Sequence, residues 1–541
     1  MKWVLACTLL IVTILPSAGP SSLPASGETD IGPEREVGSL LALLPDSTLV
    51  AAELHDLDRR WSEIRAVPAV AAFQNRLLDG SGLEPDDLPI LTGNRAALAL
   101  VPIRGGRTAI PIAVLRPTDL DRAEAILDVR AGAPSEVGAA WCRVRARSAL
   151  WVGPANAADE LDAVARGNGT SLGSLLPAAE AAKRLPEGGL VRGWVNPEAA
   201  RDYFRGMPER TLPDVGQWIA AAAAAKMDAT RWIAFRRDIL GNRLVTDGFI
   251  AYDLEKLPAP VARVLVPDAS QPPPPSSIPD DVVLAASFRT EADACLPWLR
   301  FLGQADRRGP FRNLEFWIEE FQEQSGLSLQ RELFGSLDEH AWELLLESRG
   351  KEGVQWAAVF EASDPRRIEA TLLALRDWLA GHASARSLGL ARLRPKDYRH
   401  HGTLVHGSRI ATLLGGLTGP AFAATDEHVV VGIGDRAVFT ALDLVSADGF
   451  SAEPVPDTDP PAHASFVVRG PSLARSLARF FKADTKAMTA VKEFLVRIRE
   501  ASVHVRYEKD GLRVHGEVEP AISRGPRSWD HSIAAVRDRS P

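Results

Sequence analysis

Three of the chain's eleven histidines lie in one short stretch, YRHHGTLVH, at positions 398–406. Histidine is the commonest metal ligand in proteins and a frequent acid–base catalyst, because its imidazole exchanges a proton near neutral pH. His400, His401 and His406 are therefore the residues whose type and spacing most suggest chemistry. That chemistry would be the binding of a metal ion or metal-dependent hydrolysis.

The local geometry limits how these histidines can share a metal ion. In one straight strand, His400 and His406 would face the same side about 20 Å apart, whereas zinc ligands lie about 2 Å from the ion. A turn at Gly402-Thr403 would instead bring His401 and His406 together, and these two are the candidate metal ligands. A further ligand would come from nearby in the sequence, from Asp397 or His428.

No established catalytic motif accompanies these histidines. The sequence lacks a GxxxxGK[ST] phosphate loop, an HExxH helix, a GxSxG elbow and a CxxC pair. Adjacent acidic residues such as Asp86 and Asp87 point to different sides of the backbone, so they are poor partners for acid–base catalysis. We therefore expect a protein without catalytic residues and without a cofactor.

A second candidate site is a group of aromatic residues in the second half of the chain, at Trp298, Phe301, Trp317 and Phe321. Trp317 and Phe321 are four residues apart and would share one face of a helix. A helix packed on the core explains this spacing. The alternative is an apolar surface that holds a lipid or a partner chain.

The composition is that of an ordinary globular protein, with 46% hydrophobic and 24% charged residues. A chain of 541 residues is long enough for two or more domains. The net charge is -8 and no basic patch stands out, which argues against nucleic-acid binding.

Residues 1–27 have the pattern of a secretory signal peptide. Lys2 precedes an apolar run of 13 residues that ends before Pro16, shorter than the roughly 20 residues that span a bilayer. We therefore expect an extracytoplasmic protein, periplasmic or secreted, which contacts the membrane only if this segment stays uncleaved as an anchor. Cleavage would leave Cys142 and Cys295, and we expect two free thiols although export permits a disulfide.

The sequence also repeats itself. LPDSTLVAAEL at 44–54 matches IPDDVVLAASF at 278–288. IAVLRPTDLDRAEAIL at 112–127 matches AAVFEASDPRRIEATL at 357–372. Five such blocks recur in the same order, so the chain is predicted to consist of two homologous tandem halves.

The spacing between matching residues changes along the repeat. Asp119 aligns with Asp364, an offset of 245 residues, and Gly153 aligns with Gly432, an offset of 279. The second half is therefore enlarged by 34 residues within 373–431. This enlarged region contains the three histidines, so they do not belong to the scaffold that the halves share.

Each half alternates strands, helices and hairpins, which predicts an α+β fold. We expect each half to be a largely antiparallel sheet with helices packed on one face. The first half would cover 28–260, a Pro-rich linker 261–277, the second half 278–520, and a weakly ordered tail 521–541.

The last hairpin of the second half has a clear alternating pattern, SVHVRYEKDGLRVHGEV. Asp510-Gly511 is a strong signal for a two-residue turn. With the turn there, His504 and His515 would lie on the polar face of the hairpin. We expect that face to be solvated, as in an antiparallel sheet covered on one side.

The arrangement resembles a family of bacterial exported proteins known as domain of unknown function 3352. The resemblance rests on LPDSTLVAAEL, AVLRPTDLDRAEAIL, YRHHGTLV and HVVVGIGDRAVFTALD, and covers most of residues 40–520. It implies an exported, duplicated α+β protein and implies no activity, cofactor or catalytic residue.

These observations together predict a non-enzymatic exported binding or interaction protein of unknown ligand. Its partner would be a protein or an envelope component. Two alternatives stay open: a carrier of an apolar ligand that uses the aromatic residues, and a metal-dependent hydrolase built on the His400–His406 region.

Overall fold

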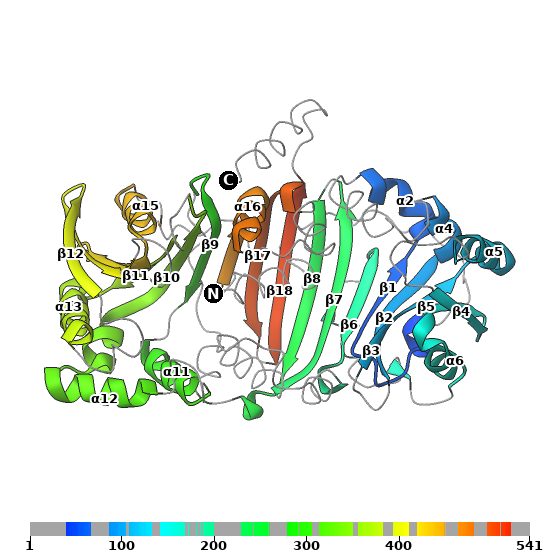
Figure 1. Cartoon of the computed structure of the whole chain (residues 1–541), viewed down its shortest axis with the longest axis horizontal. Coiled ribbons are helices and arrows are strands. Elements are labelled where there is room, and N and C mark those ends of the chain that lie inside the picture. The colour runs from blue at the N-terminus through cyan, green and yellow to red at the C-terminus, as the bar shows by residue number, and fades with distance from the viewer. Residues whose placement is uncertain are drawn as a thin grey trace.

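In the computed structural model, the chain forms two antiparallel sheets that lie side by side (Figure 1). The structure describes residues 39–66, 86–103, 108–131, 141–167, 171–172, 180, 184–185, 188–199, 229–241, 243–257, 259, 278–289, 292–305, 313–349, 355–381, 393–410, 419–447, 450, 464–480, 495–508 and 510–520. The expected signal segment, Pro-rich linker and C-terminal tail lie outside these residues.

The first part of the described chain forms an eight-stranded antiparallel sheet in the order β4-β5-β3-β2-β1-β6-β7-β8. Its strands are β1 (Val50–His55), β2 (Arg95–Ile103), β3 (Thr108–Arg116), β4 (Trp141–Ala146), β5 (Ala149–Pro154), β6 (Val191–Val195), β7 (Thr230–Leu240) and β8 (Arg243–Tyr252). Its helices are η1 (Leu40–Leu43), α2 (Leu57–Ala66), α4 (Asp87–Thr92), α5 (Leu120–Ala131), η2 (Ala155–Ala157), α6 (Ala158–Arg166) and η6 (Leu254–Lys256).

The second part forms a ten-stranded antiparallel sheet in the order β12-β13-β14-β15-β11-β10-β9-β16-β17-β18. Its strands are β9 (Val282–Arg289), β10 (Leu337–Leu346), β11 (Gln355–Ala362), β12 (Leu393–His400), β13 (Thr403–Ile410), β14 (Pro420–Ala424), β15 (His428–Ile433), β16 (Ala464–Val468), β17 (Ile498–Glu508) and β18 (Gly511–Pro520). Its helices are α11 (Ala292–Ala305), α12 (Leu314–Ser325), η8 (Leu329–Leu333), η9 (Phe334–Ser336), α13 (Pro365–Gly381), α15 (Asp435–Ser446) and α16 (Gly470–Phe480).

The two sheets meet edge to edge where β8 lies beside β18, near the middle of the molecule (Figure 1). The Tyr252 amide donates a hydrogen bond to the Asp510 carbonyl at 3.1 Å. A Cβ atom at Gly511 would lie 2.4 Å from the Ile250 carbonyl oxygen, so only glycine permits this close approach. The antiparallel sheet and the α+β class are therefore as expected.

The expectation that helices cover one face of each sheet was wrong. In the first sheet α5 packs on one face through Ala123, and α6 packs on the other through Leu161. In the second sheet α15 and α13 cover opposite faces through Val438 and Ile368. The reason is visible in β5, where five consecutive residues are buried, because a strand covered on both faces has no polar alternation.

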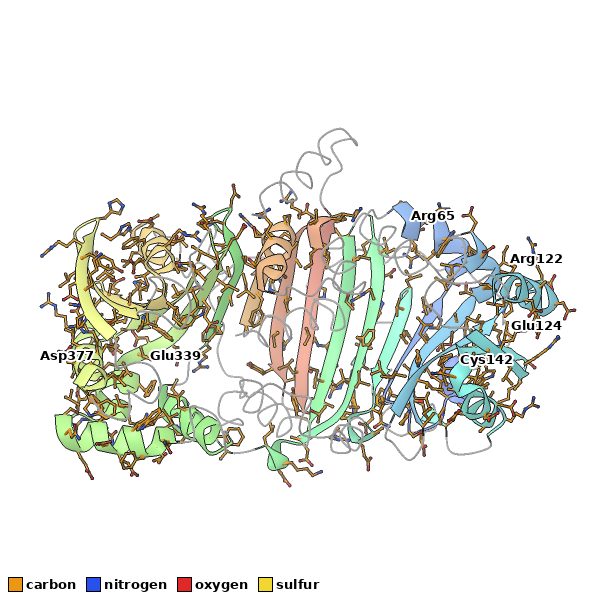
Figure 2. All side chains as sticks on the ribbon, viewed as in Figure 1. Arg65, Arg122, Glu124, Cys142, Glu339 and Asp377 are labelled. Atoms are coloured by element: carbon orange, nitrogen blue, oxygen red, sulfur yellow. The ribbon has the colours of Figure 1, made fainter. Side chains whose placement is uncertain are left out.

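Among the described residues, no helix is long and apolar enough to cross a membrane. Cys142, labelled in Figure 2, lies on β4 with its Sγ 3.4 Å from the Pro154 carbonyl oxygen. Burial raises the pKa of the Cys142 thiol. Cys142 and Cys295 are not joined by a disulfide.

The β17–β18 hairpin differs from expectation in its turn and in its burial. Glu508 pairs with Gly511, so the turn comes one residue earlier than the Asp510-Gly511 signal indicates. His504 and His515 lie directly opposite each other, and both are partly buried. The prediction that these histidines are solvated was wrong, because neighbouring side chains pack against them, among them Asp247 of β8 at 2.8 Å from His515 Nδ1.

Candidate functional site

The three histidines of the opening stretch lie on the hairpin formed by β12 and β13. His400 pairs with Thr403, so the two-residue turn is His401-Gly402, one residue earlier than the turn considered from the sequence. Both turn residues have positive φ, 47° at His401 and 91° at Gly402, as the preferred two-residue hairpin turn requires. Glycine adopts this backbone without strain, and histidine is one of the few other residues found there.

This register separates the predicted pair of metal ligands. Asp397 pairs with His406, and Tyr398 pairs with Val405 on the other face of the hairpin. His400 shares the face of Tyr398, which packs toward α15, whereas His406 faces α13. The prediction that His401 and His406 converge was therefore wrong, because a turn at His401-Gly402 directs their side chains to different helices.

One face of α15 is built to receive the hairpin. Asp435, Phe439 and Asp443 are spaced by four residues and so lie along one side of the helix. The Tyr398 hydroxyl donates a hydrogen bond to the Asp435 carboxylate at 2.9 Å. The His400 ring stacks on Phe439 with ring centroids 4.3 Å apart and an interplanar angle of 13°. These contacts fix the hairpin against the helix just before its turn.

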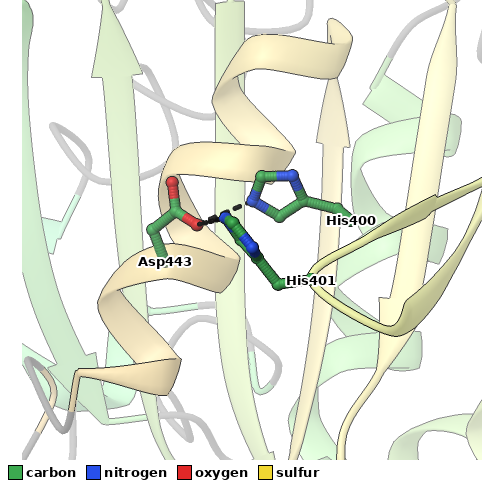
Figure 3. Close-up of side chains that lie close together, drawn as sticks. All are labelled: His400, His401 and Asp443. Carbon is green, nitrogen blue, oxygen red and sulfur yellow. Dashed lines mark hydrogen bonds and ion pairs between the residues drawn. The ribbon is translucent and has the colours of Figure 1, made fainter.

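His400, His401 and Asp443 come together at the tip of the hairpin (Figure 3). Nε2 of His400 lies 2.6 Å from Oδ1 of Asp443, and Nε2 of His401 lies 3.6 Å from the same oxygen. One ligand atom from each residue lies within 4.8 Å of the other two. The His400 side chain is 18% exposed, but those of His401 and Asp443 are 75% and 53% exposed. The cluster is therefore open to solvent on one side.

His406 occupies a different environment. It is buried, with Nε2 3.2 Å from Glu369 of α13 and Nδ1 3.3 Å from Asp397. The Arg376 guanidinium, also from α13, donates a hydrogen bond to Asp397 at 2.8 Å. Because the two carboxylates lie at opposite nitrogens of one ring, this group ties the hairpin to α13 and does not converge on a single ion.

The aromatic candidates separate in a similar way. Phe321 is fully buried and packs edge-on against Trp378 at 5.8 Å, so it belongs to the core. The burial of Phe321 agrees with the interpretation of this helix as one packed on the core, and not with the alternative of an apolar ligand surface. Trp317 is half-buried, and Phe301 packs beside the residues that follow β8. The side chain of Trp298 lies outside the described residues.

Asp443 is the functional candidate that the sequence analysis missed. It comes 42 positions after His401 and belongs to a different element, so no local spacing connects the two. One pattern in the sequence could have indicated Asp443. Asp435, Phe439 and Asp443 are spaced by four residues, which places two carboxylates and an aromatic ring on one side of a helix. Only the docking of the hairpin on α15 joins that side to the histidines.

Comparison of the chain with protein-family models, curated proteins and solved structures found no match. The resemblance to domain of unknown function 3352 stays a prediction.

Proposed function

We propose that this chain is an exported, non-enzymatic binding protein built from two homologous copies of one α+β domain. Binding takes place at the end of the second copy, where the β12–β13 hairpin lies between α13 and α15. Membership of the exported family with domain of unknown function 3352 is part of this proposal. One observation carries this proposal. The second sheet has the strand order of the first sheet with two strands added, and those two strands are the β12–β13 hairpin.

The strand orders support the duplication. Without β12 and β13, the second sheet reads β14-β15-β11-β10-β9-β16-β17-β18. This order has the same connectivity as β4-β5-β3-β2-β1-β6-β7-β8 in the first sheet, with β9 in the place of β1. The two added strands fall inside the enlarged region 373–431.

The strand registers agree with the sequence offsets. Ala113 pairs with Val152 between β3 and β5, and Ala358 pairs with Val431 between β11 and β15. These pairs are related by offsets of 245 and 279 residues, the same values that aligned the two halves of the sequence. The two sequence offsets therefore map the residue pair between β3 and β5 onto the residue pair between β11 and β15.

The helix that follows β3 or β11 begins in the same manner in both copies. Asp119 accepts a hydrogen bond from the Arg122 amide at 2.9 Å, and Asp364 accepts one from the Arg367 amide at 3.1 Å. An aspartate at this position stabilises a helix start because it satisfies an amide that has no partner within the helix. The shared cap supports a common ancestor for α5 and α13.

The β12–β13 hairpin, which has no counterpart in the first sheet, is also exposed to solvent near its turn. Leu404, just after the turn, is 38% exposed, and His401 is 75% exposed at the turn itself. Each of the three histidines faces a carboxylate, and the residues around the turn present both polar and apolar atoms to solvent. Such a surface is suited to a charged ligand or to a polar partner.

Site-specific photo-crosslinking in cells tests this role. A photoreactive amino acid replaces Leu404 on the hairpin and, as the matched control, Leu98 of β2, which is 52% exposed in the first copy. Both versions of the full chain are made with the natural N-terminal segment, and the cell envelope is then fractionated. We expect discrete adducts at position 404 and none at position 98. Equal labelling at the two positions, or none at 404, contradicts the proposal.

A further inference from the structure

Building on the proposed binding role of the hairpin, we propose that His400, His401 and Asp443 bind one divalent transition-metal ion of the zinc class. The ligand atoms are Nε2 of each imidazole and one carboxylate oxygen of Asp443. One nitrogen of each imidazole and one carboxylate oxygen lie within 4.8 Å of one another in the structure.

The distances are close to those of a metal-bound state. Ligands about 2.0–2.1 Å from a tetrahedral ion lie roughly 3.3 Å from each other. The 3.6 Å between His401 Nε2 and Asp443 Oδ1 is already near this value. The 2.6 Å between His400 and Asp443 is a hydrogen bond, and the ion replaces its proton after a shift of less than about 1 Å. Asp443 is half-exposed, so its carboxylate has room to rotate.

The two imidazoles are held in place before an ion arrives. Stacking on Phe439 fixes the plane of the His400 ring, and the Tyr398–Asp435 hydrogen bond holds β12 against α15. His401 follows His400 directly and would point to the opposite side in a regular strand. Its positive φ turns the ring back, so that the two ring centroids lie 4.3 Å apart. Ordering of this kind lowers the entropic cost of binding.

The donor set indicates the class of ion. Two imidazoles and one carboxylate suit zinc, cobalt, nickel, copper and ferrous iron, whereas magnesium and calcium prefer oxygen ligands alone. Three protein ligands leave at least one position for water or for a group from a partner. That position faces solvent because His401 is 75% exposed. The site would therefore hold an ion that a partner can reach.

A metal titration tests the inference. The full chain is prepared without an affinity tag, stripped with a chelator, and titrated with Zn²⁺ by calorimetry and with Co²⁺ by visible absorption. We expect one equivalent of each ion, with the absorption bands of nitrogen and oxygen ligands. The substitutions His401→Ala and Asp443→Asn should each weaken binding at least about tenfold, since each removes a ligand.

His340→Gln is the matched control. His340 is also a half-buried histidine of the second copy, with Nδ1 2.7 Å from the Glu361 carboxylate. It does not join a group of three metal-binding atoms among the described residues, so its loss should leave the affinity unchanged. Equal affinities for His401→Ala, Asp443→Asn and the unaltered chain would overturn the inference. Failure to bind Zn²⁺, Co²⁺, Ni²⁺, Cu²⁺ and Fe²⁺ would do so as well.

The two proposals fail separately. If no ion binds but crosslinks at position 404 persist, the hairpin binds a partner without a metal. If one ion binds at these residues but positions 404 and 98 crosslink alike, the metal site stands and the proposed binding role does not.

Discussion

Two pairs of neighbouring histidines, one on the β12–β13 hairpin and one in the β17–β18 hairpin, have opposite surroundings. His400 and His401 share one carboxylate at an exposed turn. His504 and His515 face each other inside the sheet, where β18 lies beside β8. The comparison shows that closeness of two imidazoles does not make a site, because the free nitrogens must also point at one place.

In the second pair each ring has its own partner. His504 Nδ1 lies 3.0 Å from the Ser465 hydroxyl, and His515 Nδ1 lies 2.8 Å from Asp247 of β8. Burial lowers the pKa of both imidazoles, and burial together with the nearby His504 lowers the pKa of His515 to about 2. Both histidines are therefore neutral structural groups: His504 contacts β16 within its own sheet, and His515 joins that sheet to β8 of the first.

The largest expected effect is on the stability of this junction. His515→Ala leaves the partly buried Asp247 carboxylate without its imidazole partner, so we expect a loss of about 2–3 kcal/mol in the free energy of unfolding. Urea unfolding followed by tryptophan fluorescence measures it. A change below about 0.5 kcal/mol would show that the pair contributes no more than an ordinary surface contact.

The junction should also make the protein sensitive to acid. Since the folded-state pKa values of His504 and His515 lie below the ordinary value of 6.5, the unfolded chain binds protons that the fold excludes. This contribution to stability is present well above pH 6.5 and is lost as the pH falls below it, at a slope that for His515 approaches about 1.4 kcal/mol per pH unit. Urea unfolding at pH 7.5, 6.5 and 5.5 measures this slope.

His515→Asn is the control for the acid effect, because it keeps a polar side chain and removes one titrating group. The slope between pH 6.5 and 5.5 should decrease but not vanish, because burial also lowers the pKa values of His504, His55 and His428. Burial raises the pKa of Asp247, which acts in the opposite direction as the pH falls, so both proteins are measured at the same pH values. A slope equal to that of the unaltered chain would exclude His515 as its source.

A smaller effect is expected at the turn of the other hairpin. Gly402 has φ 91°, and a Cβ atom there would meet no atom within 4 Å, so Gly402→Ala costs only backbone strain, about 1 kcal/mol. The strain should loosen the turn and displace His401. We expect faster amide exchange in β12 and β13 and weaker Co²⁺ binding. Unchanged exchange and affinity would show that the positive φ at the turn is not needed.

The smallest effect on stability is expected at His401 itself. The side chain is 75% exposed, so His401→Ala should change the free energy of unfolding by less than about 0.5 kcal/mol while it weakens metal binding. Comparison of His401→Ala with His515→Ala distinguishes a histidine that binds a metal ion from a histidine that stabilises the fold. A large loss of stability in His401→Ala would remove that distinction.

Much of the scaffold could be predicted because strands and offsets leave local traces. The matching blocks around Asp119 and Asp364 each predicted a helix after a strand, and α5 and α13 begin there with an aspartate cap. The burial of β5 on both faces was less visible, because short apolar runs do not reveal how many layers cover them. The helix arrangement was wrong for that reason.

The histidine environments could not be predicted from local sequence. A shift of one residue in the turn, from Gly402-Thr403 to His401-Gly402, takes His401 out of the strand and turns its side chain away from His406. His515 is partly buried and contacts Asp247, 268 residues earlier in the chain. Such contacts depend on how elements dock, which the spacing of residues within one element does not encode.

The most direct test of the central claim is anomalous diffraction at the zinc absorption edge from crystals soaked in Zn²⁺. We predict one strong peak about 2.1 Å from Nε2 of His400, Nε2 of His401 and a carboxylate oxygen of Asp443. A peak at His406 or between His504 and His515, or no peak near the hairpin, would contradict the account.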